Sequence, residues 1–198
     1  MLVKGKKIKG LQVFNLKQSK KIATIADLVC NTDGHKVIAL TVDKRGPFTD
    51  MRVIPFENVK SIGEDALVIE SEADIKNVSV ASKDIQGMIR DNIYITDTAV
   101  ITEDGAKLGK IADIDFDSTT GVVEEVELTQ GPIKDVSEGR KKIRGEDIVR
   151  VGKDNTVVKS DTDDRLAAKP GGGLKGMMRG MQDKIADVAE KSPFKDKK

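Results

Sequence analysis

The chain has 198 residues, of which 38% are hydrophobic and 34% are charged, and its formal net charge is +1. This composition is typical of a soluble protein with one ordinary domain or two small ones. Tryptophan is absent and aromatic residues make up only 3% of the chain, so few rings are available to stack on nucleic-acid bases.

The near-neutral net charge conceals a division along the chain. Residues 1–21 carry seven lysines and no acidic residue, and residues 165–198 carry nine basic and four acidic residues. Residues 22–164 between them carry 18 basic and 29 acidic residues. Because an acidic body repels phosphate, we do not expect nucleic acid to be a partner.

Nothing in the sequence indicates export or membrane insertion. The N-terminal lysines are not followed by the apolar core of a secretory signal, and no apolar run is long enough to span a bilayer as a helix. Cys30 is the only cysteine and cannot form an internal disulfide, which fits a reducing compartment. We therefore expect a cytoplasmic protein, with any membrane association peripheral.

Two stretches in the first half of the chain recur in the second half. IATIADLVCNTDGHKVIALTV (22–42) aligns without gaps with LGKIADIDFDSTTGVVEEVEL (108–128), an offset of 86. IPFENVKSIGEDALVI (54–69) aligns with IRGEDIVRVGKDNTVV (143–158), an offset of 89. Two copies of one unit of roughly 75 residues therefore account for most of the chain.

Each copy has the pattern of short strands joined by turns. Runs such as VIALTV and ALVIE are rich in branched apolar residues and are bounded by turn dipeptides, including Asp33-Gly34 and Asp104-Gly105. This pattern predicts a small antiparallel barrel for each copy. The segments after Ile54 and Ile143 lack strand alternation and predict a short helical turn at the same place in both copies.

The predicted fold class is all-β: two tandem small antiparallel β-barrels followed by a C-terminal amphipathic helix. The strand pattern breaks near residues 81–92, and composition becomes polar and glycine-rich after residue 160. We expect a first barrel at 1–82, a junction at 83–91, a second barrel at 92–160, a flexible linker at 161–173, the helix at 174–191 and a basic tail at 192–198.

The second copy carries the pattern G-K-I-A-D-I-x-x-D-x-x-x-G-x-V, then an apolar strand and I-x-x-E-D-I-V-x-V-G-x-D-x-V-V. This order resembles the PRC-barrel, a domain of the photosynthetic reaction centre H subunit and of a 16S-rRNA-processing factor. The first copy departs from it at Ala23, where the second copy has Gly109. The resemblance covers about residues 8–160 and implies a protein-binding scaffold without catalytic residues or cofactor.

Four carboxylates form a weak candidate metal site: Asp113, Asp115, Asp117 and Glu124 match ligand positions of an EF-hand loop. Opposite the three aspartates, the first copy has Asp27, Val29 and Asn31. Ser118 stands where the loop needs glycine, and both flanks are predicted strands. We expect no metal ion here.

The same three aspartates fit a strand better than a loop. Alternate residues of a strand share a face, which would place the aspartates on the solvent side. Ile111 and Ile114 can both face the core only if the strand has a bulge. Asp27 and Asp113 are expected to accept a hydrogen bond from a backbone N–H in both copies.

The remaining reactive residues do not predict an enzyme. His35 is the only histidine and is replaced by Gly121 in the second copy. Cys30 aligns with Phe116, an expected core position, and buried cysteines are usually inert.

The C-terminal segment has an apolar stripe with lysines at its edges. At helical spacing, Leu174, Met177, Met178, Met181, Ile185 and Val188 share one arc, flanked by Lys175, Lys184 and Lys191. Three alternatives follow: the helix packs on a barrel, docks in a groove of a partner or of another copy, or lies on an anionic membrane surface.

The function that these features favour is a non-enzymatic adaptor or scaffold. Its barrels would bind a protein partner, and its C-terminal helix would dock on a membrane surface or in a partner groove. The alternative is an accessory factor in ribosome or RNA maturation. The oligomeric state is left open.

Overall fold

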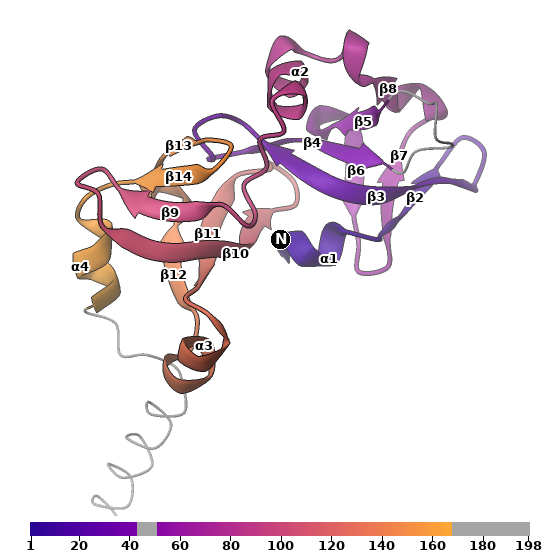
Figure 1. Cartoon of the computed structure of the whole chain (residues 1–198). Coiled ribbons are helices and arrows are strands. Elements are labelled where there is room, and N and C mark those ends of the chain that lie inside the picture. Colours follow the sequence, from indigo (N-terminus) through magenta and orange to yellow (C-terminus); the bar gives the residue numbers. More distant parts are fainter. Residues whose placement is uncertain (43–50, 168–198) are drawn as a thin grey trace, which may run out of the picture.

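The computed structural model describes residues 1–42 and 51–167, which form two seven-stranded sheets (Figure 1). The first copy builds the sheet at the right of Figure 1 and the second copy builds the sheet at the left. The N-terminus lies between them. The mostly-β architecture expected from the sequence is therefore confirmed for the described residues.

The first sheet has the strand order β6-β7-β2-β3-β4-β5-β8. Its strands are β2 (Gln12–Asn15), β3 (Lys20–Cys30), β4 (Val37–Val42), β5 (Arg52–Pro55), β6 (Val59–Ile62), β7 (Ala66–Ile69) and β8 (Lys76–Asn77). A 3-10 turn, η1 (Phe56–Asn58), joins β5 to β6.

The second sheet repeats this plan in the order β12-β11-β10-β9-β14-β13. The strands in this order are β9 (Ala99–Thr102), β10 (Lys107–Asp117), β11 (Val123–Thr129), β12 (Lys141–Arg144), β13 (Ile148–Val151) and β14 (Asn155–Val158), and the seventh strand, β1 (Leu2–Lys4), pairs with β10. The turn η4 (Gly145–Asp147) joins β12 to β13, so the helical turns predicted after Ile54 and Ile143 are confirmed.

One strand pair in each sheet departs from the expected antiparallel pattern. β2 pairs with β7 in parallel, and β9 pairs with β14 in parallel at the equivalent place. The prediction of purely antiparallel barrels was wrong here because alternation within a strand carries no information about the direction of a distant neighbour.

Four α-helices lie among the described residues. They are α1 (Gly5–Ile8), α2 (Lys83–Arg90), α3 (Pro132–Glu138) and α4 (Thr162–Ala167); two further 3-10 turns are η2 (Glu72–Asp74) and η3 (Val78–Val80). Helix α2 fills the predicted junction between the copies. Helix α4 occupies part of the segment predicted to be a flexible linker, because Leu166 packs into the core. The predicted helix at 174–191 and tail at 192–198 lie outside the described residues.

The N-terminal strand crosses from the first copy to the second sheet. β1 (Leu2–Lys4) pairs with β10, with Leu2 opposite Asp117 and Lys4 opposite Asp115. Residues 2–4 therefore extend the second sheet, and the predicted assignment of all of 1–82 to the first barrel needs this correction. Local sequence could not reveal the exchange, since the pairing joins residues more than a hundred positions apart.

The two sheets are joined at a seam formed by the β3–β4 and β10–β11 turns. Val37 N donates to Gly121 O at 2.8 Å, and Val123 N donates to His35 O at 2.9 Å. Gly34 and Gly121 have φ angles of +73° and +75°, and a Cβ on either would press on the opposite copy. Glycine is therefore required at both turn tips, for backbone conformation and for close approach.

Apolar packing continues through the seam. The rings of Phe56, from the first copy, and Phe116, from the second, meet edge to face with centroids 6.1 Å apart. Buried residues of both copies belong to one contiguous core cluster, which includes Leu28 and Leu40 on one side and Ile114 and Val126 on the other. The two copies therefore share a single hydrophobic core.

Because the core is shared, Phe116→Ala is expected to destabilise both copies together, by about 3–5 kcal/mol. Urea unfolding followed by far-UV circular dichroism and by Tyr94 fluorescence should give coincident single transitions at a lower midpoint. Val149→Ala, at an exposed position on β13, is the matched control and should change the midpoint little. Two separate transitions in the wild-type chain would contradict the shared core.

Candidate functional site

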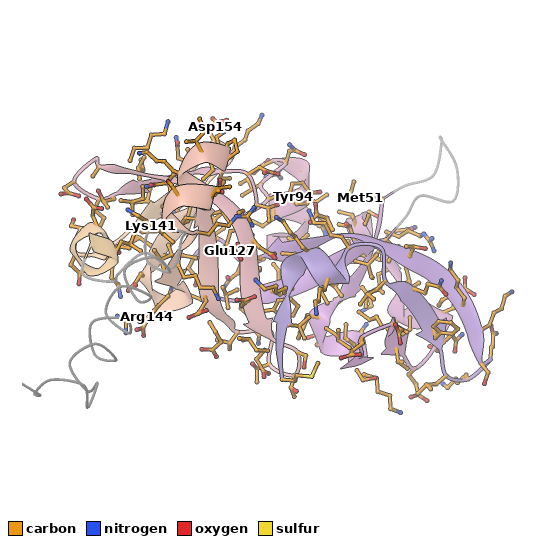
Figure 2. The ribbon with its side chains drawn as sticks, turned by 90° about the horizontal axis from the view of Figure 1, so that it is seen from below. Met51, Tyr94, Glu127, Lys141, Arg144 and Asp154 are labelled. Atoms are coloured by element: carbon orange, nitrogen blue, oxygen red, sulfur yellow. The ribbon has the colours of Figure 1, made fainter. Side chains whose placement is uncertain are left out.

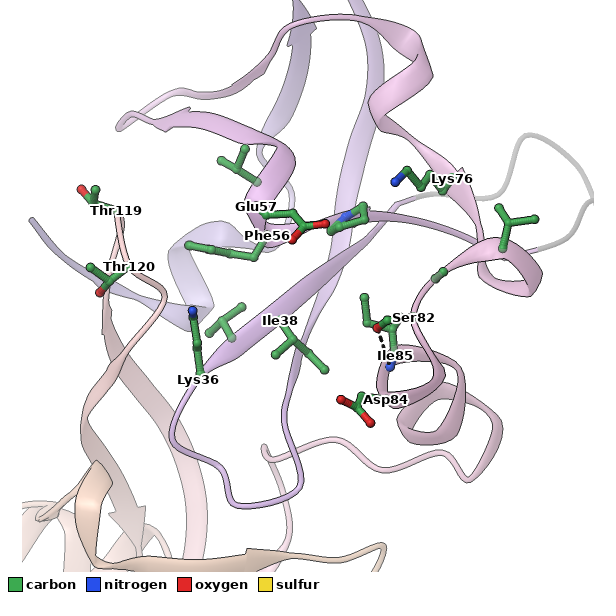
Figure 3. A pocket seen from close by; sticks show the side chains of 15 residues that line it. Lys36, Ile38, Phe56, Glu57, Lys76, Ser82, Asp84, Ile85, Thr119 and Thr120 are labelled. Carbon is green, nitrogen blue, oxygen red and sulfur yellow. Dashed lines mark hydrogen bonds between the residues drawn. The ribbon is translucent and has the colours of Figure 1, made fainter.

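A groove of about 520 Å³ opens where the two copies meet helix α2 (Figure 3). We call it the seam groove. It is formed by the start of β4, the end of β5 with η1, Lys76 of β8, the η3–α2 segment and the turn between β10 and β11. The described residues that line it include Lys36, Ile38, Phe56, Glu57, Lys76, Val80, Asp84, Ile85, Thr119 and Thr120.

The seam groove has an apolar floor and a polar rim. Ile38, Phe56 and Ile85 supply apolar surface at its base, and Val80 at its edge is 70% exposed. The rim carries both signs of charge, with Lys36 and Lys76 against Glu57 and Asp84 (Figure 3). An apolar centre surrounded by polar groups is the usual composition of a protein-binding surface.

Local hydrogen bonds fix two walls of the groove, the η3–α2 segment and the β10–β11 turn. Ser82 caps α2 by accepting the Ile85 N–H at 3.4 Å, and Gln86 Nε2 donates to Ala81 O at 2.8 Å. Across the groove, Asp117 Oδ1 accepts the N–H groups of Thr119 and Thr120 at 2.9 and 2.8 Å. Both walls are therefore preorganised by side chain–backbone bonds.

Sequence reasoning did not find the seam groove. Its lining comes from five separate segments, four in or after the first copy and one in the second, and none of them carries a binding motif. Only the pairing of the two turn tips brings Thr120 near Phe56. The exposure of the apolar side chain of Val80, in the segment before α2, is visible only in the structure.

The two equivalent aspartates Asp27 and Asp113 act on the backbone, as predicted. Asp27 Oδ1 accepts the Leu28 N–H at 2.8 Å, and Asp113 Oδ1 accepts the Ile114 N–H at 2.9 Å. Asp113 also accepts the Lys6 N–H of helix α1 at 2.9 Å. Both carboxylates thus support strand irregularities and, for Asp113, the N-terminal segment.

The weak candidate metal site is occupied by nitrogen donors of the chain itself. Asp115 lies 3.0 Å from Lys142 Nζ, and Asp117 lies 2.8 Å from the Met1 amine. Glu124 is exposed and lines a different groove, together with His35. Among the residues that the structure describes, there is no group of three or more His, Cys, Asp or Glu side chains that could hold a metal ion.

Burial of the aspartates differs from the prediction. Asp113 and Asp115 are only 3% and 5% exposed, because α1 and β1 lie against this part of β10. The predicted bulge is confirmed, since the β10–β11 register shifts between Ile111 and Asp113 and again between Asp115 and Phe116.

Cys30 and His35 are both engaged in contacts that hold the fold together. Cys30 is buried in the shared core, and burial, with smaller contributions from the charges of Asp27 and Asp33, raises the pKa of its thiol to about 12. His35 Nε2 lies 2.8 Å from the Ile148 carbonyl oxygen, so this ring nitrogen carries a proton and donates across the seam.

An ion-pair network covers the outer face of β10, β11 and β12. Lys142 Nζ lies 2.6 Å from Glu125 in addition to its contact with Asp115, and Lys4 Nζ lies 2.9 Å from Glu127. Arg140 Nη1 donates to Glu127 Oε1 at 2.8 Å. Figure 2 labels Glu127 on this face. These charges neutralise one another, so the face is polar without a strong net field.

A family model for the PRC-barrel domain matches residues 2–76 and 95–165. The chain belongs to the PRC-barrel family. The first matched segment contains strands β2 to β7 of the first sheet and the second contains β9 to β14, so the resemblance and the two tandem PRC-barrel copies are confirmed. Comparison with curated proteins gave no match. Membership of the PRC-barrel family indicates a protein-interaction or scaffold role.

Two expectations from the sequence concern membranes: that no helix spans one, and that the C-terminal segment binds one or a partner. Within residues 1–42 and 51–167, no helix is long and apolar enough to cross a membrane. The expected membrane- or partner-binding residues lie outside the described residues: Leu174, Lys175, Met177, Met178, Met181, Lys184, Ile185, Val188 and Lys191.

Because Cys30 is buried with a pKa of about 12, its thiol should not react with Ellman's reagent in the folded protein near neutral pH. One equivalent should react once urea unfolds the chain, at the same midpoint as the circular dichroism signal. Rapid labelling without denaturant would show that Cys30 is accessible and would reopen a role for it.

Arg140 contacts two carboxylates, Glu127 and Asp135, whose lowered pKa values make the stability of the fold depend on pH. Burial opposes ionisation of Glu127, but hydrogen bonds from Arg140 and Lys4 outweigh it and hold its pKa below the usual value. The Thr129 hydroxyl, followed by the Gln130 N–H and Arg140, lowers the pKa of Asp135 against its partial burial. The stability from these lowered pKa values is present above about pH 4 and is lost as pH falls through the folded-state values.

Arg140→Gln should therefore lower the free energy of unfolding at pH 7 by less than about 1 kcal/mol, since Arg140 is partly exposed. The difference from wild type should shrink as the pH falls below about 4. Urea midpoints measured at both pH values test this, with Arg90→Gln as a control that leaves Glu127 and Asp135 unaffected. A difference that grows in acid would contradict the assignment.

Proposed function

We propose that this PRC-barrel protein is a non-enzymatic adaptor whose double barrel binds a segment of a protein partner in the seam groove. The observation that carries the proposal is the groove itself, an open groove whose apolar floor comes from the first copy and α2 and whose rim includes Thr119 and Thr120 of the second copy. In this proposal the C-terminal segment attaches the complex to a membrane surface or to a partner groove.

The dimensions and chemistry of the seam groove support binding of a short chain segment. A volume of about 520 Å³ accommodates a few side chains, and the floor can bury them against Ile38 and Phe56. Charged groups of both signs on the rim, such as Lys36 and Asp84, can fix the direction of a bound segment. Apolar burial would supply affinity and the rim would supply specificity.

The residues of the groove favour binding over catalysis. The described side chains that line it include no cysteine or histidine, so they present neither a thiol nucleophile nor an imidazole for proton transfer. Its hydroxyl groups, Ser82, Thr119 and Thr120, have no such base beside them in the groove. In the proposal, the charged side chains of the rim, Lys36, Glu57, Lys76 and Asp84, bind the partner segment.

Site-specific photo-crosslinking in cells tests the proposal. A crosslinking amino acid at Thr120, on the rim of the groove, should form a discrete protein adduct. The same amino acid at Val149, an exposed position on β13, should not. Thr119→Arg, which adds a bulky side chain to the rim without entering the core, should reduce the Thr120 adduct at least about tenfold.

Equal adducts at both positions, or none at Thr120, would overturn the seam groove as the binding site. Adducts to RNA or to ribosomal proteins, lost at high salt, would favour the alternative role in ribosome or RNA maturation over the adaptor.

A further inference from the structure

Helix α3 presents two apolar side chains to solvent at one extremity of the described fold. Ile133 is 85% exposed and Val136 is 71% exposed, which are the two largest values among the large hydrophobic residues that the structure describes. The two residues are three positions apart, so they share one side of the helix. Figure 1 shows α3 projecting below the second sheet. We call Ile133 and Val136 the α3 tip.

Hydrogen bonds at the base of α3 hold the helix in this orientation. Asp135 accepts the Thr129 hydroxyl at 2.6 Å and the Gln130 N–H at 3.0 Å. Arg140, beyond the other end of the helix, donates to Asp135 at 3.3 Å. Gln130 Nε2 donates to Leu108 O on β10 at 2.9 Å. The helix is therefore tied to the sheet through its polar side, and this arrangement turns the α3 tip outward.

Lysines without ion pairs lie around the base of α3. Lys134 belongs to the helix, and Lys141 follows it at the start of β12. Lys110 on β10 lies opposite Thr129, at the strand end that leads into α3. All three are at least partly exposed, and none forms an ion pair with a carboxylate of residues 1–42 or 51–167.

The charge around the α3 tip is positive although the middle of the chain is acidic. Residues 132–141 carry three basic and two acidic residues, and Lys110 lies next to them. One of the two acidic residues, Asp135, is already engaged by Arg140 and by the Thr129 hydroxyl. Charges are screened over about 8 Å at physiological ionic strength, so nearby lysines act on a partner at the tip more strongly than distant carboxylates.

An apolar tip with lysines at its base fits an anionic lipid surface. Branched apolar side chains can enter the boundary between headgroups and acyl chains, while ammonium groups on flexible stems contact the phosphates. The tip projects outward on a helix of seven residues. A lipid boundary deforms around such a projection, whereas a folded protein would need a pocket of matching shape.

We propose that the α3 tip, together with Lys110, Lys134 and Lys141, binds an anionic lipid surface. This inference goes beyond the proposed adaptor function, in which the C-terminal segment is the point of attachment. It assigns a lipid contact to the second barrel itself. Helix α2, which forms a wall of the seam groove, lies at the opposite end of the view from α3 (Figure 1). A partner in the groove and a lipid surface at the tip would therefore not compete.

A fluorescent reporter at the tip tests the contact in the full-length chain, which has no tryptophan of its own. Ile133→Trp should show blue-shifted emission, and quenching by brominated acyl chains, with mixed phosphatidylglycerol–phosphatidylcholine vesicles at low salt. Phosphatidylcholine vesicles alone, or high salt, should give at most about a tenth of the change. Val149→Trp, at an exposed position on β13, is the matched control and should not respond.

Further substitutions in this reporter chain test the two parts of the site. Lys134→Glu with Lys141→Glu should raise the lipid concentration for half-maximal quenching at least about tenfold. Lys17→Glu with Lys20→Glu, in the turn between β2 and β3, makes the same change in net charge away from α3 and should raise it less than about twofold. Val136→Asp should weaken quenching as strongly as the change at Lys134 and Lys141. Far-UV circular dichroism verifies that each variant is folded.

Three results would overturn the inference. Sedimentation with anionic vesicles without a change in the reporter at position 133 would place the lipid contact elsewhere in the chain. Equal losses from the two double lysine variants would show that net charge, rather than this site, drives binding. No response to vesicles, with a protein adduct from a crosslinking amino acid at position 133, would assign the tip to a protein partner. Crosslinking at Thr120 is independent of all three, so this inference and the adaptor proposal can fail separately.

Discussion

The backbone exchange between the β3–β4 and β10–β11 turns is the interaction on which the rest of the structure depends. Two hydrogen bonds, from Val37 to Gly121 and from Val123 to His35, join the sheets at their tips. They form only because Gly34 and Gly121 allow the chains to approach closely. The exchange brings Phe56 onto Phe116 and merges two small cores into one, which suits units of a size that bury little surface alone.

The two copies share one backbone plan but use their outer faces differently. The first copy covers Val29, Ala39 and Val53 with α2, so its outer face is apolar and buried at these three positions. The second copy carries ion pairs at the same register positions and is joined at its edge by β1. The two outer faces therefore differ in chemistry: that of the first copy is apolar and covered by α2, and that of the second carries ion pairs.

The seam groove follows from the same joint. Its walls belong to α2 and to the β10–β11 turn, which approach one another only because the sheets meet at that turn. A partner bound there would contact both copies, so the double barrel acts as one binding unit.

The sequence by itself determined the repeat, the PRC-barrel plan, the helical turns at Phe56 and Gly145 and the bulge around Asp113, because each is recorded in local pattern. Tertiary structure alone decided the crossing of β1, the parallel β2–β7 and β9–β14 pairs and the packing of Leu166, which depend on residues distant in the chain. It also decided the burial of Asp113 and Asp115, which alternation had placed toward solvent. The physical reason is that periodicity specifies which residues share a face, whereas contacts across the fold specify what covers that face.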